Sequence, residues 1–206
     1  MPLIIAQLLA LIVGLTLHEF AHAWVGHFLG DTTAQRQGRL TLNPLAHIDP
    51  LATLALPLLL ILVRSPVVFA AAKPVPFNPW AVRGGRWGAA AVGAAGPLTN
   101  LLIALFFSLC YRILPYNPTA ATVFGAMIVV NVGLFVFNLI PFPPLDGSRV
   151  LYAVAPPGLR EVMDRIEQAG FMVLLLVMLV GYQYIAPIVA QITLAIVGLL
   201  VPSGNF

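Results

Sequence analysis

The chain has 206 residues, of which 60% are hydrophobic and only 8% are charged, whereas a soluble globular domain carries about 25% charged residues. So few charged side chains cannot cover the surface of a 22.0 kDa globule, which excludes a soluble monomer. A mean hydropathy of +0.98 places the chain in a lipid bilayer and excludes intrinsic disorder. The net charge of +3 is too small to indicate a nucleic-acid partner, and the single cysteine, Cys110, excludes an intramolecular disulfide and a cysteine-based zinc site.

Apolar segments separated by polar or proline-rich loops predict an all-α polytopic membrane protein, with about 4–6 membrane helices that include a re-entrant segment. The whole chain, 1–206, is expected to form one membrane-embedded domain. The first helix is predicted at 3–29. It has no basic segment before it and no small-residue cleavage site after it, which indicates a retained membrane helix and not a signal peptide.

The polar stretch that follows contains a segment, 39–42, whose alternating pattern predicts a short edge strand. The next apolar run is short and has Pro57 in its middle, so 51–69 is expected to dip into the membrane and return on the same side. Membrane helices are then predicted at 87–111 and 119–140, and the first of them opens with small residues that allow close packing.

The C-terminal quarter of the chain combines one surface segment with one long apolar segment. Charged and apolar residues alternate at helical spacing over 158–169, which predicts an amphipathic helix on the membrane surface. Residues 170–201 are apolar again, and they are expected to form one span and a second, partial one that is broken near Pro187.

Three ionisable residues gather in one turn of the first predicted helix, in the string His18-Glu19-Phe20-Ala21-His22. Residues i and i+4 lie about 40° apart around a helix, so both imidazoles project from one face at the spacing that binds one Zn²⁺. Glu19 is displaced around the helix and is predicted to act as a base and not as a ligand. Ionisable groups at membrane depth are costly unless they are paired or functional, which argues against a chance match.

A zinc protease site needs a third protein ligand, and several acids are candidates. Asp146 directly follows a membrane helix, next to prolines that stop the helix and Gly147, which allows a sharp turn. Its alternative role is to satisfy the N-terminus of the next helix. The other candidate acids lie in loops or in the amphipathic segment: Asp31, Asp49, Glu161, Asp164 and Glu167.

Three motifs follow one another along the chain: His18-Glu19-x-x-His22, Gly96-Pro97-Leu98-Thr99-Asn100 and Asn138-x-x-Pro141-x-Pro-Pro-Leu145-Asp146-Gly147. Together with the loop strings at 38–50 and 72–76, they resemble the site-2 protease family of intramembrane zinc metalloproteases, in its short prokaryotic branch without a PDZ domain. The resemblance runs from about residue 10 to residue 155. It implies one Zn²⁺ per chain held by His18, His22 and Asp146, with Glu19 as the catalytic base. It also implies that Asn138 helps to hold an extended substrate backbone.

The remaining histidines and the tryptophans are assigned structural roles and not roles at the metal site. His27 lies on a different face of the first helix from His22 and is interpreted as a helix-end residue, while His47, beside Asp49, is assigned a local hydrogen bond. The three tryptophans are interpreted as markers of the membrane interfaces: Trp24, Trp80 and Trp87.

The site also predicts a topology. If the two histidines and Asp146 bind one metal, the helices at 3–29 and 119–140 end on the same side of the bilayer, and the helix at 87–111 starts there. Arg112 then lies on the opposite side, and Arg64 is ambiguous. Eight basic residues lie on the metal side: Arg36, Arg39, Lys73, Arg83, Arg86, Arg149, Arg160 and Arg165. This bias predicts a plasma-membrane protein whose active site faces the cytoplasm.

The predicted function is hydrolysis of peptide bonds in transmembrane proteins or peptides, within or near the bilayer. Because a helix hides its amides, the substrate must unwind and is expected to add as a strand to an exposed edge, at 39–42 or 73–77. The alternative is a transporter or channel that relays protons or metal ions through histidines and carboxylates. A third alternative, an inactive scaffold, is disfavoured by the intact set of ligands and base. The oligomeric state is not predicted.

Overall fold

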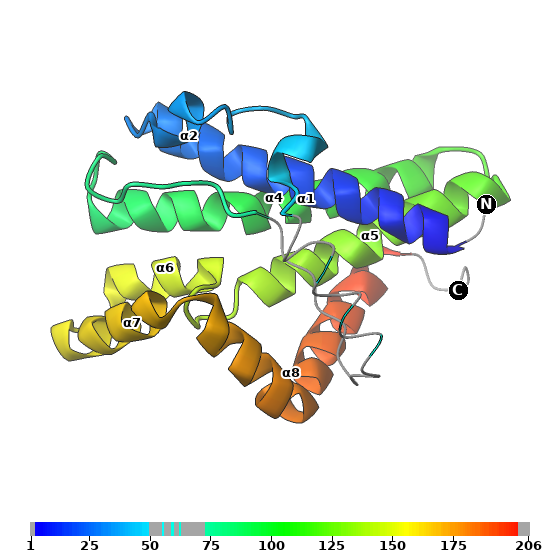
Figure 1. Ribbon diagram of the computed structural model, residues 1–206. Coiled ribbons are helices and arrows are strands. Elements are labelled where there is room, and N and C mark those ends of the chain that lie inside the picture. Colours follow the sequence, from blue (N-terminus) through cyan, green and yellow to red (C-terminus); the bar gives the residue numbers. More distant parts are fainter. Residues whose placement is uncertain (1–2, 50–54, 56–58, 60–61, 63–72, 202–206) are drawn as a thin grey trace.

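The computed structural model describes residues 3–49, 55, 59, 62 and 73–201 (Figure 1). Its central helices are α1 (Leu3–Phe28), α4 (Arg86–Ile113) and α5 (Pro118–Asn138), which pack on one another. A fourth long helix, α8 (Phe171–Leu200), packs on α5. The shorter elements are α2 (Thr33–Arg36), the 3-10 helix η1 (Pro44–His47), α6 (Asp146–Val154) and α7 (Pro157–Ala169). None of the residues in these ranges forms a strand. The predicted all-α class is therefore confirmed.

Four helical segments in the described part of the chain are long and apolar enough to cross a membrane: α1, α4, α5 and Leu179–Leu200 of α8. On α4, the side chains of Leu98, Leu102, Phe106 and Leu109 are each at least 50% exposed. Their spacing of three or four residues places them in one stripe along the helix. A continuous apolar stripe of this kind suits contact with lipid and not with water. The protein is a multi-pass membrane protein.

The core of the bundle relies on small residues that let the helices approach closely. Ala6 and Ala10 of α1 are fully buried against Ile103 of α4 and Met127 of α5. A second buried cluster joins α4 and α5 to the C-terminal part of α8 through residues such as Val197. Close approach of this kind is how membrane helices gain packing energy without a hydrophobic driving force between them.

The directions of the helices agree with the predicted topology. Figure 1 shows the N-terminal end of α1 beside the α4–α5 turn, and the C-terminal end of α1 beside the start of α4. The turn is well defined, because Asn117 accepts hydrogen bonds from the backbone N–H groups of Thr119 and Ala120, and Pro118 begins α5. The second half of α1, the first half of α4 and the end of α5 therefore lie toward one end of the bundle.

Two predictions about secondary structure are wrong. Residues 39–42 do not form a strand, because their backbone has no ladder partner among the described residues; the N–H of Arg39 instead closes a turn onto the carbonyl of Ala34. The helix α8 is not broken at Pro187 but continues through it, and it changes direction part-way along (Figure 1). A proline is tolerated inside a membrane helix as a bend, since neighbouring groups satisfy the freed backbone.

Other predicted elements fared differently. The amphipathic segment at 158–169 is confirmed as α7. The nine-residue helix α6 begins at Asp146 and is the helix named in the alternative role of this acid. The re-entrant segment expected at 51–69 lies almost wholly outside the described residues, so that prediction stays open.

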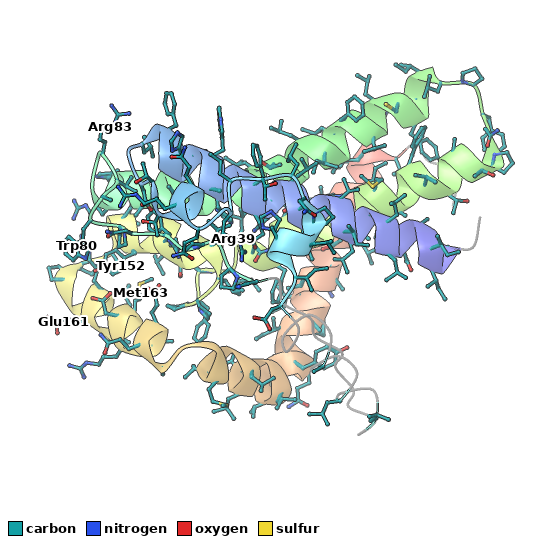
Figure 2. All side chains as sticks on the ribbon, turned by 45° about the horizontal axis from the view of Figure 1, so that its top comes forward. Arg39, Trp80, Arg83, Tyr152, Glu161 and Met163 are labelled. Carbon is teal, nitrogen blue, oxygen red and sulfur yellow. The ribbon has the colours of Figure 1, made fainter. Side chains whose placement is uncertain are left out.

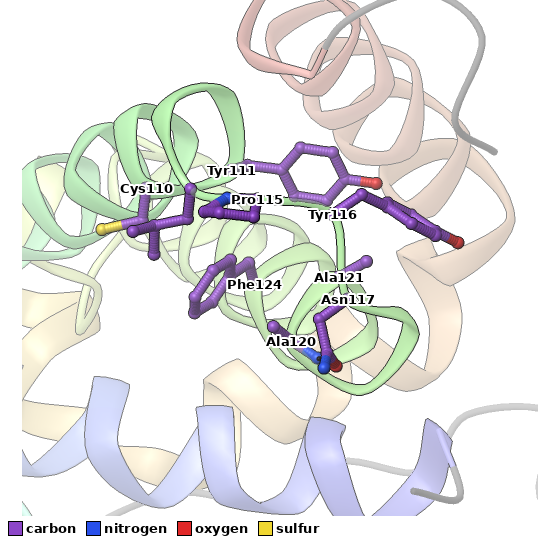
Figure 3. Close-up of a pocket in the computed structure, with 9 residues that line it drawn as sticks. Cys110, Tyr111, Pro115, Tyr116, Asn117, Ala120, Ala121 and Phe124 are labelled. Atoms are coloured by element: carbon purple, nitrogen blue, oxygen red, sulfur yellow. Dashed lines mark hydrogen bonds between the residues drawn. The ribbon is translucent and has the colours of Figure 1, made fainter.

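A small pocket lies at the end of the bundle away from the histidine motif, around the α4–α5 turn (Figure 3). Cys110, Tyr111, Tyr116 and Phe124 contribute to its wall. No histidine or carboxylate lines it. The chemistry predicted from the sequence is therefore located elsewhere.

Candidate metal centre

His18, His22 and Asp146 converge although 124 residues separate the last two. The Nε2 atoms of His18 and His22 lie 3.0 Å apart, and Oδ2 of Asp146 lies 3.1 Å from the first and 3.2 Å from the second. Tetrahedral Zn²⁺ with bonds of about 2.0–2.1 Å places its ligand atoms about 3.3 Å apart. The triangle of these three atoms therefore has the size of a zinc site, and its members are the group of potential metal ligands that the described residues bring together.

Glycine makes this convergence possible. A Cβ atom on Gly96 of α4 would lie 2.4 Å from Nε2 of His22 and 2.6 Å from Nε2 of His18. One turn earlier, a Cβ atom on Gly93 would lie 3.0 Å from the carbonyl oxygen of Asp146. The two glycines thus form a flat face on α4 against which both the histidine helix and the start of α6 pack. The small residues noted in the sequence serve the site as well as helix packing.

The loop before Asp146 folds back tightly. The proline cluster ends α5, and a Cβ atom on Gly147 would lie 2.2 Å from the carbonyl oxygen of Leu139. Asp146 is the first residue of α6, and its carboxylate points to the histidines. Burial raises the pKa of this carboxyl, but the adjacent rings of His22 and His18 oppose the effect more strongly, so the pKa lies below its usual range.

Hydrogen bonds at the Nδ1 atoms orient the two imidazoles. Nδ1 of His22 lies 2.7 Å from the backbone carbonyl of Val92, and Nδ1 of His18 lies 2.6 Å from Oδ1 of Asn100. A carbonyl oxygen only accepts, so the Nδ1 atom of His22 carries a hydrogen. This leaves the Nε2 lone pair of His22 directed at the site, in the tautomer that a metal ligand requires.

Glu19 is buried beside the histidines. Its carboxylate contacts the segment around Val75, whereas the histidines contact Asp146. Its Oε2 accepts a hydrogen bond of 3.1 Å from the backbone N–H of Val75. Glu19 is absent from the group of potential ligands formed by His18, His22 and Asp146. The structure thus separates the acid that was predicted as base from the acid that was predicted as ligand.

The segment that contains Val75, residues 73–78, has no regular secondary structure and is held at both ends. The Arg39 guanidinium donates to the carbonyl of Lys73 at 2.5 Å, and it points into the molecule in Figure 2. At the other end, the N–H of Asn78 donates to Oδ2 of Asp31 at 2.8 Å. The guanidinium of Arg149 also lies over the ring of Phe77, 4.6 Å from its centre. We call this segment the strap.

The other candidate acids lie elsewhere. Asp31 accepts from the backbone and hydroxyl of Thr33 in addition to Asn78, and Asp164 accepts from the hydroxyl of Tyr152. Glu161 and Glu167 are exposed on α7, and Figure 2 places Glu161 at the periphery. Asp49 lies in the loop that follows η1.

Asn138 and the other singled-out residues have local surroundings. Asn138 is half-buried, and its Nδ2 donates to the carbonyl of Leu134 at 2.9 Å. His47 makes the local hydrogen bond expected of it, with the carbonyl of Thr41. His27 lies in the last turn of α1, outside the triangle. The tryptophans are exposed, as residues at a membrane interface would be: Trp24, Trp80 and Trp87.

Three contributors to the site were missed in the sequence: the contact of Asn100 with His18, the space left by Gly96, and the backbone of Val75. A signal existed for the first two, because both belong to the Gly96–Asn100 string. The contact of the Val75 backbone could not be predicted, since a backbone N–H has no sequence signature.

The chain is similar to a known peptidase family and to several known proteins. The model of peptidase family M50 matches residues 113–181, which include Asn138 and Asp146. Three relatives are each named as a putative zinc metalloprotease. YwhC of Bacillus subtilis is 40% identical over 81% of this chain and 77% of its own length. Rip2 of Mycolicibacterium smegmatis is 28% identical over 82% of this chain and 64% of its own length. Rip2 of Mycobacterium tuberculosis (strain H37Rv) is 32% identical over 75% of this chain and 57% of its own length.

No solved structure matches the chain. The relatives are proteases by name, which does not favour the transporter alternative. Because YwhC is 40% identical over 77% of its length, and the family model covers the third of the three motifs, the resemblance found in the sequence is confirmed: this chain belongs to peptidase family M50, the site-2 proteases.

Proposed function

We propose that this chain is an intramembrane zinc endopeptidase, in which His18, His22 and Asp146 hold one Zn²⁺ and Glu19 is the catalytic base. The observation that carries the proposal is the triangle of two imidazole nitrogens and one carboxylate oxygen, with sides of 3.0–3.2 Å. Two histidines and one carboxylate are a ligand set of catalytic zinc, which keeps a fourth position open. The names of the relatives supply independent support for zinc.

The proposed peptide hydrolysis needs a polarised carbonyl and a base. Bound zinc would polarise the scissile carbonyl and lower the pKa of a coordinated water to roughly 7. Glu19 takes the proton of the attacking water on its carboxylate and returns it to the leaving amine. Burial of Glu19 beside the two histidines keeps bulk water from competing for this proton transfer, since all three residues are at most 9% exposed.

The substrate is proposed to be a transmembrane protein or peptide. Four apolar helices hold the site in the bilayer, and the lipid-facing stripe on α4 leaves an apolar surface for neighbouring helices. A substrate helix must unwind before cleavage, because its scissile amide is otherwise hidden in an i→i−4 hydrogen bond. Asn138 is proposed to hold the unwound backbone, since an amide side chain both donates and accepts.

The proposed location is the plasma membrane, with the site toward the cytoplasm. The end of α1, the start of α4 and the end of α5 lie toward the end of the bundle that holds the site. Arg112 is at the opposite end, where its guanidinium donates to the carbonyls of Leu199 and Leu200. The excess of arginine and lysine on the site's side supports the cytoplasmic assignment.

The test is to measure zinc and peptide cleavage on purified protein in detergent and in liposomes. Glu19→Gln is expected to keep stoichiometric zinc and to lose cleavage of a transmembrane peptide, because only the base is removed. His18→Ala and His22→Ala are expected to lose most of the zinc, and Asp146→Ala to weaken its binding. Stoichiometric zinc in a protein that lacks both histidines would overturn the assignment, as would full cleavage by Glu19→Gln. Zinc flux into liposomes without cleavage would favour a transporter.

A further inference from the structure

Two asparagine side chains lie in the middle of the apolar bundle, and the proposed chemistry does not use them directly. Asn100 of α4 and Asn131 of α5 are both 0% exposed. A buried amide without partners is costly, on the order of a few kcal/mol. Two such groups at membrane depth therefore need partners, and the partners indicate their role.

The hydrogen bonds of Asn100 fix which way its amide points. Its Nδ2 donates to the carbonyl of Gly14 at 3.2 Å and to Oδ1 of Asn131 at 2.9 Å. Nδ2 of Asn131 in turn donates to the carbonyl of Met127 at 2.8 Å. Both hydrogens of the Asn100 amide are thus used on oxygen atoms, which only accept. If the amide of Asn100 were flipped, its Oδ1 would face two acceptor oxygens and make no hydrogen bond with them. Oδ1 therefore points the other way, toward His18.

Oδ1 of Asn100 lies 2.6 Å from Nδ1 of His18. Because this oxygen is an acceptor, Nδ1 must carry the hydrogen, and the lone pair of a neutral ring is then on Nε2. Nε2 is the atom that points to His22 and Asp146. The amide orientation, set by contacts in α1 and α5, therefore decides which nitrogen of His18 is free to bind metal.

The bundle is shaped around this pair of amides. A Cβ atom on Gly14 of α1 would lie 2.7 Å from Oδ1 of Asn131, so a larger residue there would displace the pair. His22 needs no such support, because the backbone carbonyl of Val92 orients it. Of these two histidines, only His18 has its tautomer set by a side chain.

We propose that Asn100 is a positioning residue that holds His18 in the metal-binding tautomer, and that Asn131 acts on the metal only through Asn100. The proposal rests on the proposed function, in which His18 is a zinc ligand. Partners behind a metal-binding histidine typically change metal affinity by about 10–100-fold when they are removed. The alternative is that the two amides merely join three helices.

The first measurement is the dissociation constant for zinc, by competition with a chelator. Asn100→Leu is close in size and removes the acceptor, so we expect a 10–100-fold weaker zinc affinity. Asn131→Leu is expected to weaken zinc less, and to have no further effect in the Asn100→Leu background. The matched control is Ser108→Ala, which removes another buried polar group of α4, one that donates to Leu200 at 2.5 Å far from the metal. It is expected to leave the affinity unchanged.

The second measurement reads the tautomer directly and needs no metal. Asp146 also faces Nε2 of His18, at 3.1 Å, and would compete for the proton, so the ring nitrogens are observed by ¹⁵N NMR in an Asp146→Ala background. In this background the neutral ring of His18 is expected in the Nδ1–H form, because Oδ1 of Asn100 still accepts from Nδ1. In Asn100→Leu with Asp146→Ala, the Nε2–H form is expected to appear.

The outcomes separate the two ideas. An Nε2–H ring in the presence of Asn100 would overturn the positioning role, as would a zinc affinity of folded Asn100→Leu within twofold of the parent. If Asn100→Leu does not fold, the tautomer in the Asp146→Ala protein and in its Asn131→Leu derivative still decides the matter. A parent protein that binds no zinc but shows the Nδ1–H form would refute the proposed function and leave this orientation standing.

Discussion

The backbone N–H of Val75 donates a 3.1 Å hydrogen bond to Oε2 of Glu19, across 56 residues of sequence. Val75 lies between Pro74 and Pro76, which have no N–H of their own. Within this tripeptide, the strap therefore offers a single backbone donor, and that donor is bound to the proposed catalytic base. The contact engages one oxygen of the carboxylate and leaves the other for the proposed proton transfer.

Replacement of Val75 by proline tests this contact, because proline removes the N–H in a segment that already has proline on both sides. A hydrogen bond to a charged group contributes about 1.5–3 kcal/mol, so cleavage is expected to fall about tenfold or more, with zinc content unchanged. Val75→Ala, which keeps the N–H, is the control. Equal rates for the two variants would show that the contact is unused, and a faster Val75→Pro would show that the strap restrains Glu19.

Gly96→Ala is expected to abolish zinc binding. Its Cβ atom would lie 2.4 Å from Nε2 of His22 and 2.6 Å from Nε2 of His18, so at least one ligand must move. Gly125→Ala on α5 is the matched control, because a Cβ atom there meets nothing within 4 Å. Zinc content by elemental analysis checks the prediction, and normal zinc in Gly96→Ala would mean that the helices separate easily at this point.

Asn138→Leu is expected to fold, to keep zinc and to cleave about tenfold more slowly or worse, as for about 1.4 kcal/mol of lost transition-state stabilisation. In the described part of the chain, the side chain donates to the carbonyl of Leu134 in its own helix. Rates, zinc content and thermal stability in detergent are measured together. Loss of stability in step with activity would assign Asn138 a structural role instead.

The cytoplasmic orientation is checked by labelling with a membrane-impermeant thiol reagent. Cysteines introduced at Arg36, Lys73 and Arg160 in a Cys110→Ala background are expected to react from the cytoplasmic side. A cysteine at Tyr116, in the α4–α5 turn and 75% exposed, serves as the control for the opposite side. Reaction of position 73 from outside would mean that the segment before the strap crosses the membrane.

Asp31 is expected to make the fold sensitive to acid. Burial raises the pKa of its carboxyl, but the hydrogen bonds from Asn78 and Thr33 and the charge of Arg36 lower it by more, so the pKa lies below its usual value. Its contribution to stability is then complete above the unfolded pKa of about 3.9 and is lost as the pH falls through the lower folded value. Asp31→Asn is expected to melt at a lower temperature at neutral pH, and the difference from the parent is expected to shrink below about pH 4. A constant difference would contradict this.

Local patterns carried much of the information about this protein. The positions of α1, α4, α5 and α7 follow from hydrophobic runs, from periodicity and from prolines, which act within a few residues. The pairing of His18 with His22 follows from the helical repeat, because four residues return the chain to the same face. The bilayer itself follows from composition, since so few charges cannot cover a soluble surface.

Tertiary packing decided the remainder. Six acids were candidates for the third ligand on local grounds, and only the packing of α6 against the glycine face of α4 brings Asp146 to the histidines. The absence of a strand at 39–42 depends on which partner is within reach of its backbone. The contacts of Asn100 with His18 and of Val75 with Glu19 join residues 82 and 56 positions apart. Sequence periodicity does not encode such contacts, because they arise only when separate helices meet at a fixed distance and rotation.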